Sequence, residues 1–392
     1  MNYILFDGPS RLNLLPFTFT RPVADIRIGI MTVREKWEKY LGVTTTSITE
    51  DYLSSKFPMV EMEENILINA AYLPSPELVE KVRALKQNQA IFKDETVIAF
   101  YAQEGQADIN FSNFKIIEFN NKVLNLNHTY DIFAKNGEAL KADFEILSEE
   151  RVSQPLSVTN NIIGENDIFI EEGAIVEFAT LNTKNGPIYI GKNAEIMEGS
   201  MIRGPFAICN DSTVKLGSKI YGPTTIGPHC KVGGEVNNSV LFGYSNKGHD
   251  GFLGNSVLGE WCNIGADSNN SNLKNNYAEV KLWNYDTENF AKTGLQFCGL
   301  IMGDHSKCGI NTMFNTGTVV GVSANIYGSG FPRNFVPSFS WGGSSGFSTY
   351  LTKKAFEAAT VVMKRRNLIF SDEDKNILLA VFEDSKKWRK TE

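Results

Sequence analysis

The sequence predicts an α/β N-terminal domain, then a left-handed parallel β-helix built from hexapeptide repeats, and short C-terminal helices. Three observations lead to this fold class. Residues 1–150 mix short apolar strands with amphipathic helices. Residues 151–340 carry an aliphatic residue at every sixth position over long stretches, and residues 341–392 return to a helical pattern. We therefore expect three regions, with boundaries near residues 150 and 340.

The composition limits the class of protein before any motif is considered. The chain has 392 residues, 21% of them charged and 11% aromatic, which is typical of a globular protein with two or three domains. The net charge of −7 argues against a nucleic-acid partner. The apolar run ending at Phe6 is too short for a signal peptide, and no stretch reaches the ~20 apolar residues of a membrane span. Five scattered cysteines are typical of reduced, buried thiols, so we expect a cytoplasmic protein without a membrane partner.

The N-terminal region alternates strand and helix signals. Strands are expected at residues 3–6, 66–68, 96–101 and 115–118. A helix over residues 32–41 has Thr32 as its N-cap and Gly42 as its C-cap. A second helix opens with Ser75 as its N-cap and Pro76 at its first position. This mixture predicts a sheet covered by helices.

A six-residue repeat dominates the middle region. Eight successive hits occur at Ile190, Ile196, Ile202, Ile208, Val214, Ile220, Ile226 and Val232, and a second run follows at Met302, Cys308, Phe314, Val320 and Ile326. Neither a helix nor an alternating strand produces this period. In a solenoid, each short strand points one aliphatic side chain inward, and the stacked coils bury one continuous column. A sandwich of hairpins is the rival interpretation, but it needs turns about every 8–12 residues, which these spacings do not provide.

The two runs of repeats are out of phase with each other. Val232 and Met302 are separated by 70 residues, which is not a multiple of six. We therefore expect inserted loops between them, in an interval that includes residues 248–251, 261–266 and an Asn-rich stretch at 269–276. Loops that interrupt a regular solenoid are the usual places for binding groups.

The C-terminal region predicts a connector and two helices. The Gly-Gly-Ser-Ser-Gly segment at residues 342–346 is expected to be a flexible connector. One helix is expected over residues 352–367, and Ser371 caps a second. The basic residues 364–366 at the end of the first helix have two interpretations, a solvated helix end or a phosphate contact.

Segments of the central interval resemble one known family. Residues 248–255 (Gly-His-Asp-Gly-Phe-Leu-Gly-Asn) resemble its Gly-His-x-x-Tyr-x-Gly-Asp segment, and residues 263–266 resemble its Asn-x-Gly-Ala segment. Residues 272–273 fall where archaeal members carry Asn-Leu, and residues 303–311 match the stretch where repeats resume. The chain thus resembles the sugar nucleotidyltransferases that carry a hexapeptide-repeat acyltransferase domain. Bifunctional N-acetylglucosamine-1-phosphate uridyltransferase / glucosamine-1-phosphate acetyltransferase is such a protein.

This resemblance implies roles for four residues of the interval. His249 would be the general base, and Asn263 and Asn272 would contact the sugar or orient the base. Histidine suits this role because its pKa lies nearest to working pH, and amide side chains can donate hydrogen bonds to a developing oxyanion. Phe252 stands where the relatives carry Tyr, so a hydroxyl that could contact the sugar is absent. The acceptor can therefore differ from the sugar that the relatives use. The alternative for His249 is a loop histidine hydrogen-bonded to backbone.

The start of the chain carries the second part of the resemblance. Residues 8–22 resemble the family's nucleotide-binding signature, Gly-x-Gly-Thr-Arg-x-x-Pro-Leu-Thr-x-x-Arg-Pro-Lys. The resemblance implies that a loop containing Gly8 and Ser10 cradles a triphosphate and that Arg11 and Arg21 offset its charge. Residues 130–133 resemble a Trp-Asp-Leu-Leu segment near the end of such domains, which implies a hinge helix there.

The N-terminal loop departs from this signature in three ways. Its paired glycines are reduced to one, followed by Pro9, which cannot donate an N–H. The Lys after Arg-Pro is absent. The Gly-Asp that holds Mg²⁺ in the family corresponds to Asn69-Ala70, which has no carboxylate. Asp7 and Asp108 are the remaining candidates, so the metal ligands stay unknown, and the loop is either an active site or a structural remnant.

Three functions remain open from the sequence. In the first, a nucleotidyltransferase converts a sugar-1-phosphate and a nucleoside triphosphate, with Mg²⁺, into a nucleotide sugar, and its β-helix transfers an acyl group from acyl-CoA, here acetyl-CoA, to a sugar. The second keeps only the acyltransferase and treats the N-terminal domain as a degenerate nucleotide-binding module. The third is a non-catalytic trimeric scaffold. Because the family places acyl sites between neighbouring subunits, the resemblance also implies a homotrimer.

Overall fold

A six-stranded mixed sheet forms the N-terminal region of a computed structural model, which describes residues 1–106 and 109–389. Its strands are β1 (Asn2–Phe6), β2 (Thr46–Ile48), β3 (Glu64–Asn69), β4 (Gln89–Lys93), β5 (Thr96–Gln103) and β6 (Lys115–Glu118), in the order β2-β1-β3-β5-β4-β6. β1 runs parallel to β2 and β3, whereas β5 runs antiparallel to both of its neighbours. Four of these strands confirm predictions, and β2 and β4 are additional.

The helices of this region include both predicted ones, and each of those begins at its predicted N-cap. They are α1 (Val33–Leu41), α2 (Asp51–Ser54) and α3 (Pro76–Arg83), and short 3₁₀ segments lie at Pro9–Leu14, Phe17–Phe19, Val23–Asp25 and Phe111–Asn113. Thr32 forms a capping box with Glu35 at the start of α1, and Gly42 ends the helix with a φ of 74°. The Ser75 hydroxyl accepts a hydrogen bond at the start of α3.

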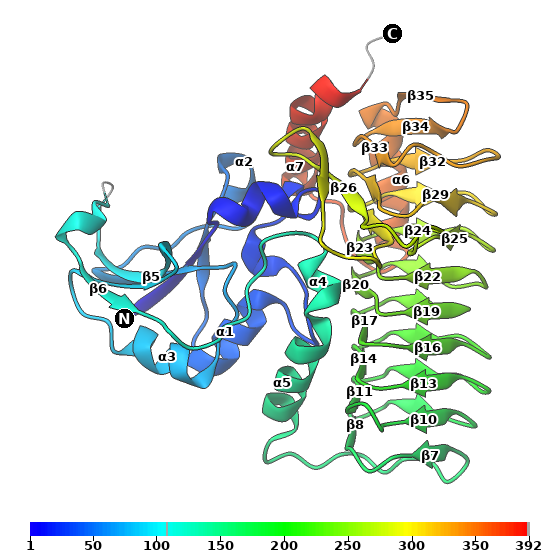
Figure 1. The fold of residues 1–392 in the computed structure, drawn as a ribbon, viewed down its shortest axis with the longest axis horizontal. Coiled ribbons are helices and arrows are strands. Elements are labelled where there is room, and N and C mark those ends of the chain that lie inside the picture. The colour runs from blue at the N-terminus through cyan, green and yellow to red at the C-terminus, as the bar shows by residue number, and fades with distance from the viewer. Residues whose placement is uncertain (107–108, 390–392) are drawn as a thin grey trace.

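Two helices join the sheet to the rest of the chain. The predicted hinge is α4 (Asp131–Ala134), and it is followed by α5 (Asn136–Ser148), which the sequence did not predict. Figure 1 shows α5 running alongside the first solenoid strands. Asn136 at its start donates to the carbonyl of Pro223 (3.0 Å) and to Thr225 (3.1 Å), so α5 is fixed to the solenoid by its first residue.

The middle region is a parallel β-solenoid of about ten turns, with three faces. Face 1 contains β7 (Asn161–Ile163), β10 (Thr180–Asn182), β13 (Met201–Arg203), β16 (Lys219–Tyr221), β19 (Glu235–Asn237) and β22 (Phe252–Gly254), beside which lies the pair β25 (Asn269–Asn270) and β30 (Met313–Phe314). Face 2 contains β8 (Ile168–Ile170), β11 (Ile188–Ile190), β14 (Phe206–Ile208), β17 (Thr224–Ile226), β20 (Val240–Gly243), β23 (Val257–Glu260), β28 (Leu300–Met302), β31 (Thr318–Val320) and β33 (Phe335–Val336). Face 3 contains β9 (Ile175–Val176), β12 (Glu195–Ile196), β15 (Thr213–Val214), β18 (Lys231–Val232), β21 (Asn246–Lys247), β24 (Asn263–Ile264), β29 (Lys307–Cys308), β32 (Asn325–Ile326) and the hairpin β34 (Ser340–Gly343)–β35 (Gly346–Thr349).

The six-residue column is confirmed. All eight residues of the first run and all five of the second are buried in one apolar cluster that fills the solenoid. On face 2, Ile190 pairs in register with Ile208, which in turn pairs with Ile226. Each coil therefore places its aliphatic residue directly over that of the coil before, and this stacking buries the column continuously.

The expected loops between the two runs are mostly regular coils, which corrects the prediction. The register partners Thr213 and Lys231 are 18 residues apart, but Lys231 and its next partner Asn246 are only 15 apart. A shortened coil shifts the repeat out of phase without interrupting the solenoid. The true insertion is residues 273–299, which include the antiparallel hairpin β26 (Lys281–Asn284)–β27 (Asn289–Lys292).

The C-terminal region also differs from its prediction at one point. Residues 342–346 form the turn of the β34–β35 hairpin rather than a flexible connector. The two expected helices are α6 (Thr352–Lys364) and α7 (Asp372–Asp384), followed by a 3₁₀ segment at Ser385–Trp388, and Ser371 forms the capping box of α7. Asp374 of α7 pairs with Lys56, just after α2, at 2.6 Å. The C-terminal helices therefore bridge the solenoid end and the N-terminal sheet (Figure 1).

The N-terminal sheet and face 2 of the solenoid share one apolar core. The ring of Phe17 lies 4.9 Å from that of Phe242 on β20. The Arg27 side chain donates to the carbonyl of Phe242 (3.0 Å), and Thr225 donates to the carbonyl of Gly29 (2.8 Å). These contacts fix the two regions as one packed unit. Among the described residues, no helix has the length and apolarity needed to cross a bilayer.

Candidate functional sites

His249 lies at an exposed corner of the solenoid. The corner joins β21 on face 3 to β22 on face 1, and the imidazole is exposed. The residue lines a pocket of about 520 Å³ whose lining includes Lys215, Leu216, Gly233, Gly234, Gly248, His249, Asp250, Ala266 and Asp267. The small residues of neighbouring coils leave room beside His249 at this corner, enough for part of a substrate.

Phe252 and Asn272 lie together, farther along face 1. A Cβ atom added to Gly254 would lie 2.4 Å from the Phe252 ring and 2.7 Å from the Asn272 amide nitrogen, so both side chains meet over this glycine. The Asn272 amide also donates to Asn255 at 2.8 Å. Phe252 is the first residue of β22, and the pocket that His249 lines includes neither it nor Asn272.

Asn263 occupies a third position, on face 3. It starts β24, pairs in register with Asn246, and its side chain is exposed. Its backbone N–H donates to Ser306, so its position is set by the coil rather than by a loop. The structure thus places the four residues on two neighbouring coils of the solenoid and on two different faces.

Lys247 is a functional candidate that the sequence analysis missed. It pairs in register with Val232 and occupies the inward column, where its side chain is only 2% exposed. Its ammonium donates to the carbonyl oxygen of His249. Burial lowers the pKa of Lys247 to about 8, and the nearby carboxylates of Asp250 and Asp267 oppose this shift. The spacing of 15 residues from Val232 was the signal that could have revealed it.

Four basic side chains gather on face 3 near this corner. Lys215 lines the His249 pocket, and Lys231 lies on the neighbouring strand. Burial lowers the pKa of Lys231, and the positive charges of Arg366, Lys215 and Arg365 lower it further. Arg366, just after α6, also lies 3.5 Å from the Asn246 side chain. The end of α6 is therefore brought to the coil that carries His249.

The N-terminal loop holds its charged side chains in internal contacts. Arg11 contacts Asp7 (2.9 Å), Glu50 (3.2 Å) and the hydroxyl of Tyr52 (3.1 Å). The two oxygens of Asp7 also accept from the Val23 N–H (2.7 Å) and the Thr49 hydroxyl. Burial raises the pKa of Asp7, whereas Arg11 and these hydrogen bonds act to lower it. A triphosphate would have to displace part of this network to reach Arg11.

The rest of this loop is tightly packed. A Cβ atom at Gly8 would lie within 2.9 Å of the Asn69 side chain, so Asn69 fills the space beside the loop. The Ser10 hydroxyl is buried and has no hydrogen-bond partner among the described residues. Asp108 lies outside the described residues. Within the described ranges, no three His, Cys, Asp or Glu side chains cluster in a way that could hold a metal ion.

Arg21 lies at the interface with the solenoid, away from Arg11. Its guanidinium pairs with Asp304 and lies 3.3 Å from Glu260, and it stacks over the Phe242 ring at 5.3 Å. Burial would lower the pKa of Arg21, but these two carboxylates together raise it. Arg21 also lines a pocket of about 250 Å³ between the sheet, the solenoid and α7. The structure therefore separates the two arginines that the sequence placed in one loop.

His305 lines the same pocket. Its Nδ1 is buried without a partner among the described residues, and its ring lies parallel to Trp261 at 6.2 Å. Burial lowers the pKa of His305 to about 3. The imidazole is therefore neutral at physiological pH, which makes it a hydrogen-bonding group rather than a charge.

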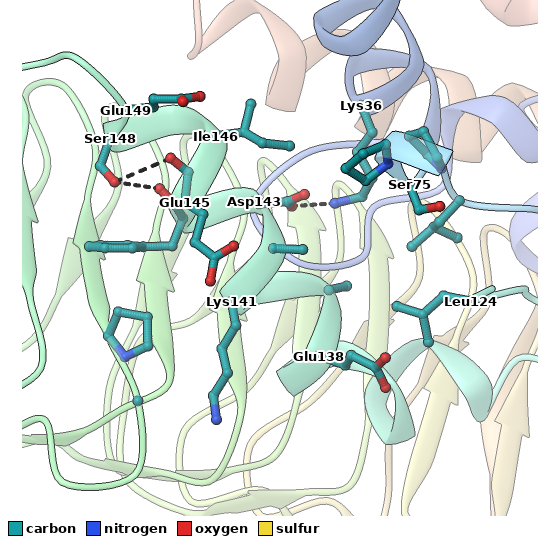
Figure 2. Close-up of a pocket in the computed structure, with 18 of the residues that line it drawn as sticks. Lys36, Ser75, Leu124, Glu138, Lys141, Asp143, Glu145, Ile146, Ser148 and Glu149 are labelled. Atoms are coloured by element: carbon teal, nitrogen blue, oxygen red, sulfur yellow. Dashed lines mark hydrogen bonds and ion pairs between the residues drawn. The ribbon is translucent and has the colours of Figure 1, made fainter. Parts of the chain in front are cut away.

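A cavity of about 1050 Å³ lies between α5, the N-terminal sheet region and the first coils. Figure 2 shows Lys36 of α1 and Asp143 of α5 pointing toward each other across it, and their side chains form a buried ion pair. Asp143 also accepts from the N–H groups of Ile30 (2.7 Å) and Met31 (3.1 Å). Burial lowers the pKa of Lys36 and raises that of Asp143, and their mutual attraction opposes both shifts. No sequence pattern marks these residues, because they meet only in the fold.

The five cysteines carry no catalytic arrangement. All are free and buried. Burial raises the pKa of Cys209 to about 11 and that of Cys230 to about 12. A thiol with a raised pKa is a poor nucleophile at neutral pH, so these residues act in packing.

Comparison with known proteins identifies one of the two regions. Residues 3–152 match the family model described as sugar nucleotidyl transferase. No curated protein matches the chain. The chain therefore carries an N-terminal domain that matches the sugar nucleotidyl transferase family model, joined to a parallel β-solenoid of about ten turns that has the hexapeptide-repeat pattern.

Proposed function

We propose that this protein is a transferase that modifies sugar phosphates or nucleotide sugars. Its N-terminal domain binds the nucleotide or sugar phosphate, and its solenoid transfers an acyl group, typically acetyl, from acyl-CoA to an amine or hydroxyl of the sugar. The observation that carries the acyl part is the exposed His249 imidazole over a pocket of about 520 Å³ at a solenoid corner. The family match of residues 3–152 supports the substrate class.

In this proposal, acyl transfer needs one base and no covalent enzyme intermediate. The sugar amine or hydroxyl attacks the thioester carbonyl while His249 accepts its proton, so a C–N or C–O bond forms. The tetrahedral intermediate then expels the CoA sulfur as the C–S bond breaks, and His249 returns the proton to it. Asn263 and Asn272 carry amide donors that can orient the sugar or stabilise the oxyanion. Because these residues lie on different faces, a neighbouring subunit of a homotrimer would bring the site together.

The basic side chains near this corner support acyl-CoA as the donor. CoA carries several phosphate groups, and phosphates bind to clustered Lys and Arg side chains. Lys215 lines the pocket itself, Lys231 lies on β18 of the face that carries Asn263, and Arg366 reaches the Asn246 side chain on that face. The phosphate interpretation of the basic end of α6 is therefore part of the proposal.

Replacing His249 by glutamine is expected to lower acyl transfer by at least about 10²-fold, because a positioned general base contributes that much or more. Release of free thiol from acetyl-CoA, with a panel of sugar phosphates and nucleotide sugars as acceptors, measures the effect. His229→Gln is the matched control, because that histidine stacks on Tyr244 at another corner. Equal loss in both variants, or full activity in His249→Gln with the same oligomeric state, would contradict the proposed base.

Nucleotidyl transfer is the second candidate, and the family match favours it. The described residues offer no preformed Mg²⁺ site at the N-terminal loop, because the Asp7 oxygens are already used by Arg11, Val23 and Thr49. We therefore derive no metal-dependent step from this geometry.

Calorimetric titration with nucleoside triphosphates, with and without Mg²⁺, tests this second candidate. Glu50→Gln is expected to strengthen nucleotide binding severalfold, because it removes one of the two carboxylates that hold Arg11. Arg11→Gln is expected to weaken it. If no triphosphate binds in a metal-dependent way to any of these proteins, nucleotidyl transfer is excluded and the acyltransferase stands alone.

A further inference from the structure

A lysine takes the place of an aliphatic residue inside the solenoid. In the inward column of face 3, Val232 lies in register below Lys247, and Ile264 follows on the next strand. The Lys247 side chain is 2% exposed. Within the described residues, no carboxylate lies within salt-bridge distance of its ammonium, which instead donates to the carbonyl of His249.

This arrangement is costly for folding and needs an explanation. A buried amine without a carboxylate partner loses its hydration and gains only one hydrogen bond to a backbone oxygen. The charged groups that face it are the Asp250 and Asp267 carboxylates of the corner, and the Cys308 thiol of a later coil is also near. A Val, Leu or Ile at this position would continue the column. Residues that oppose stability in this way are concentrated at functional sites.

The lysine holds the segment that carries His249. Residues 248–251 form an exposed corner with a glycine at each end, and Gly251 adopts a φ of 115°. Asp250 accepts from the Asp267 N–H (3.0 Å), and Gly251 accepts from the Glu235 N–H (3.2 Å). Among the described residues, the carbonyl of His249 has Lys247 as its only hydrogen-bond partner. The buried ammonium therefore ties down the backbone carbonyl of the residue that carries the imidazole.

We propose that Lys247 is a positioning residue of the acyl-transfer site, which draws the His249 carbonyl inward and thereby fixes the direction of the imidazole over its pocket. This proposal rests on the function proposed above. Its physical basis is that a loop flanked by glycines samples many conformations, and that misplacing a catalytic group by about 1 Å can cost roughly 10²-fold in rate.

Lys247→Met tests the proposal, because methionine fits an apolar column and removes only the ammonium. We expect kcat for acyl transfer to fall about tenfold to a hundredfold while KM for acyl-CoA changes less than about twofold. Amide hydrogen exchange at residues 248–251 should become faster by a similar factor. Lys307→Met is the matched control, because Lys307 likewise donates to a histidine carbonyl, that of His305, at 2.9 Å and two coils farther along face 3. Lys307→Met should leave both the kcat for acyl transfer and the hydrogen exchange of residues 248–251 unchanged.

The outcomes separate this proposal from the function on which it rests. If Lys247→Met exchanges faster at the corner but keeps its full kcat, the contact is only structural and the positioning role is wrong. Unchanged exchange at residues 248–251 would also overturn it. Full activity in His249→Gln would instead reject the proposed base, and hydrogen exchange would still show whether Lys247 anchors the corner.

Discussion

Replacing Asp304 by alanine is expected to destabilise the protein by about 3–5 kcal/mol, because it leaves a buried guanidinium without its main partner. Asp304 is 3% exposed and Arg21 is 6% exposed. The Asp304 carboxylate accepts from Arg21, from the Thr20 hydroxyl (2.7 Å) and from the Glu260 N–H (2.9 Å). Glu260 lies farther from Arg21 and is more exposed, so it replaces little of the lost attraction.

The midpoint and slope of urea unfolding would measure this effect, together with limited proteolysis. Because Asp304 joins the solenoid to the segment after β1, we expect faster cleavage between the two regions as well as lower stability. Combining Asp304→Ala with Arg21→Met should recover much of the loss, since the unpaired charge is then removed. Glu138→Ala, which breaks the exposed Lys122–Glu138 pair, is the control and should cost less than about 1 kcal/mol. If Asp304→Ala also lowers the free energy of unfolding by less than about 1 kcal/mol, the Arg21–Asp304 pair does not hold the N-terminal region to the solenoid.

The same pair illustrates why sequence patterns located the fold better than the sites. Arg21 lies in a motif that predicts a phosphate contact, and nothing local indicates that its partner is Asp304, 283 positions later. By contrast, the caps of α1 depend on Thr32 and Gly42, which act within one turn of the helix they limit. Local chemistry can be predicted from local sequence, but the partner of a buried charge depends on the whole fold.

The solenoid contains residues whose positions could be predicted from the sequence and residues whose positions could not. Its inward column could be predicted because each aliphatic residue meets its counterpart one coil away at a fixed spacing. The shortened coil between Lys231 and Asn246 broke that spacing, and this hid the inward position of Lys247. The cavity beside α5 could not be predicted from the sequence either, because Lys36 and Asp143 come from regions that meet only after folding. Where a repeat is interrupted, the register of the paired strands therefore locates inward residues better than the residue spacing along the sequence does.

Lys247→Met is also expected to stabilise the folded protein, and this second large effect depends on pH. Burial lowers the pKa of Lys247 to about 8 from its usual value of 10.5, so the unfolded chain binds this proton more tightly than the folded one. That difference corresponds to about 3 kcal/mol, which opposes folding in full below pH 8. As the pH rises from 8 to 10.5 the unfolded chain also loses the proton, and the cost disappears.

Urea unfolding of the wild type and Lys247→Met between pH 7 and 10.5 would measure this difference. At pH 7 the variant should be more stable by up to about 3 kcal/mol, and the gap should narrow steadily above pH 8. Lys219→Met, which removes a largely exposed lysine of the solenoid on β16, serves as the control for lysine removal. A constant gap across this range would mean that the Lys247 ammonium is not destabilised by burial. If Lys247→Met gains stability but loses acyl transfer, the lysine serves the acyl-transfer site although it destabilises the apolar core of the solenoid.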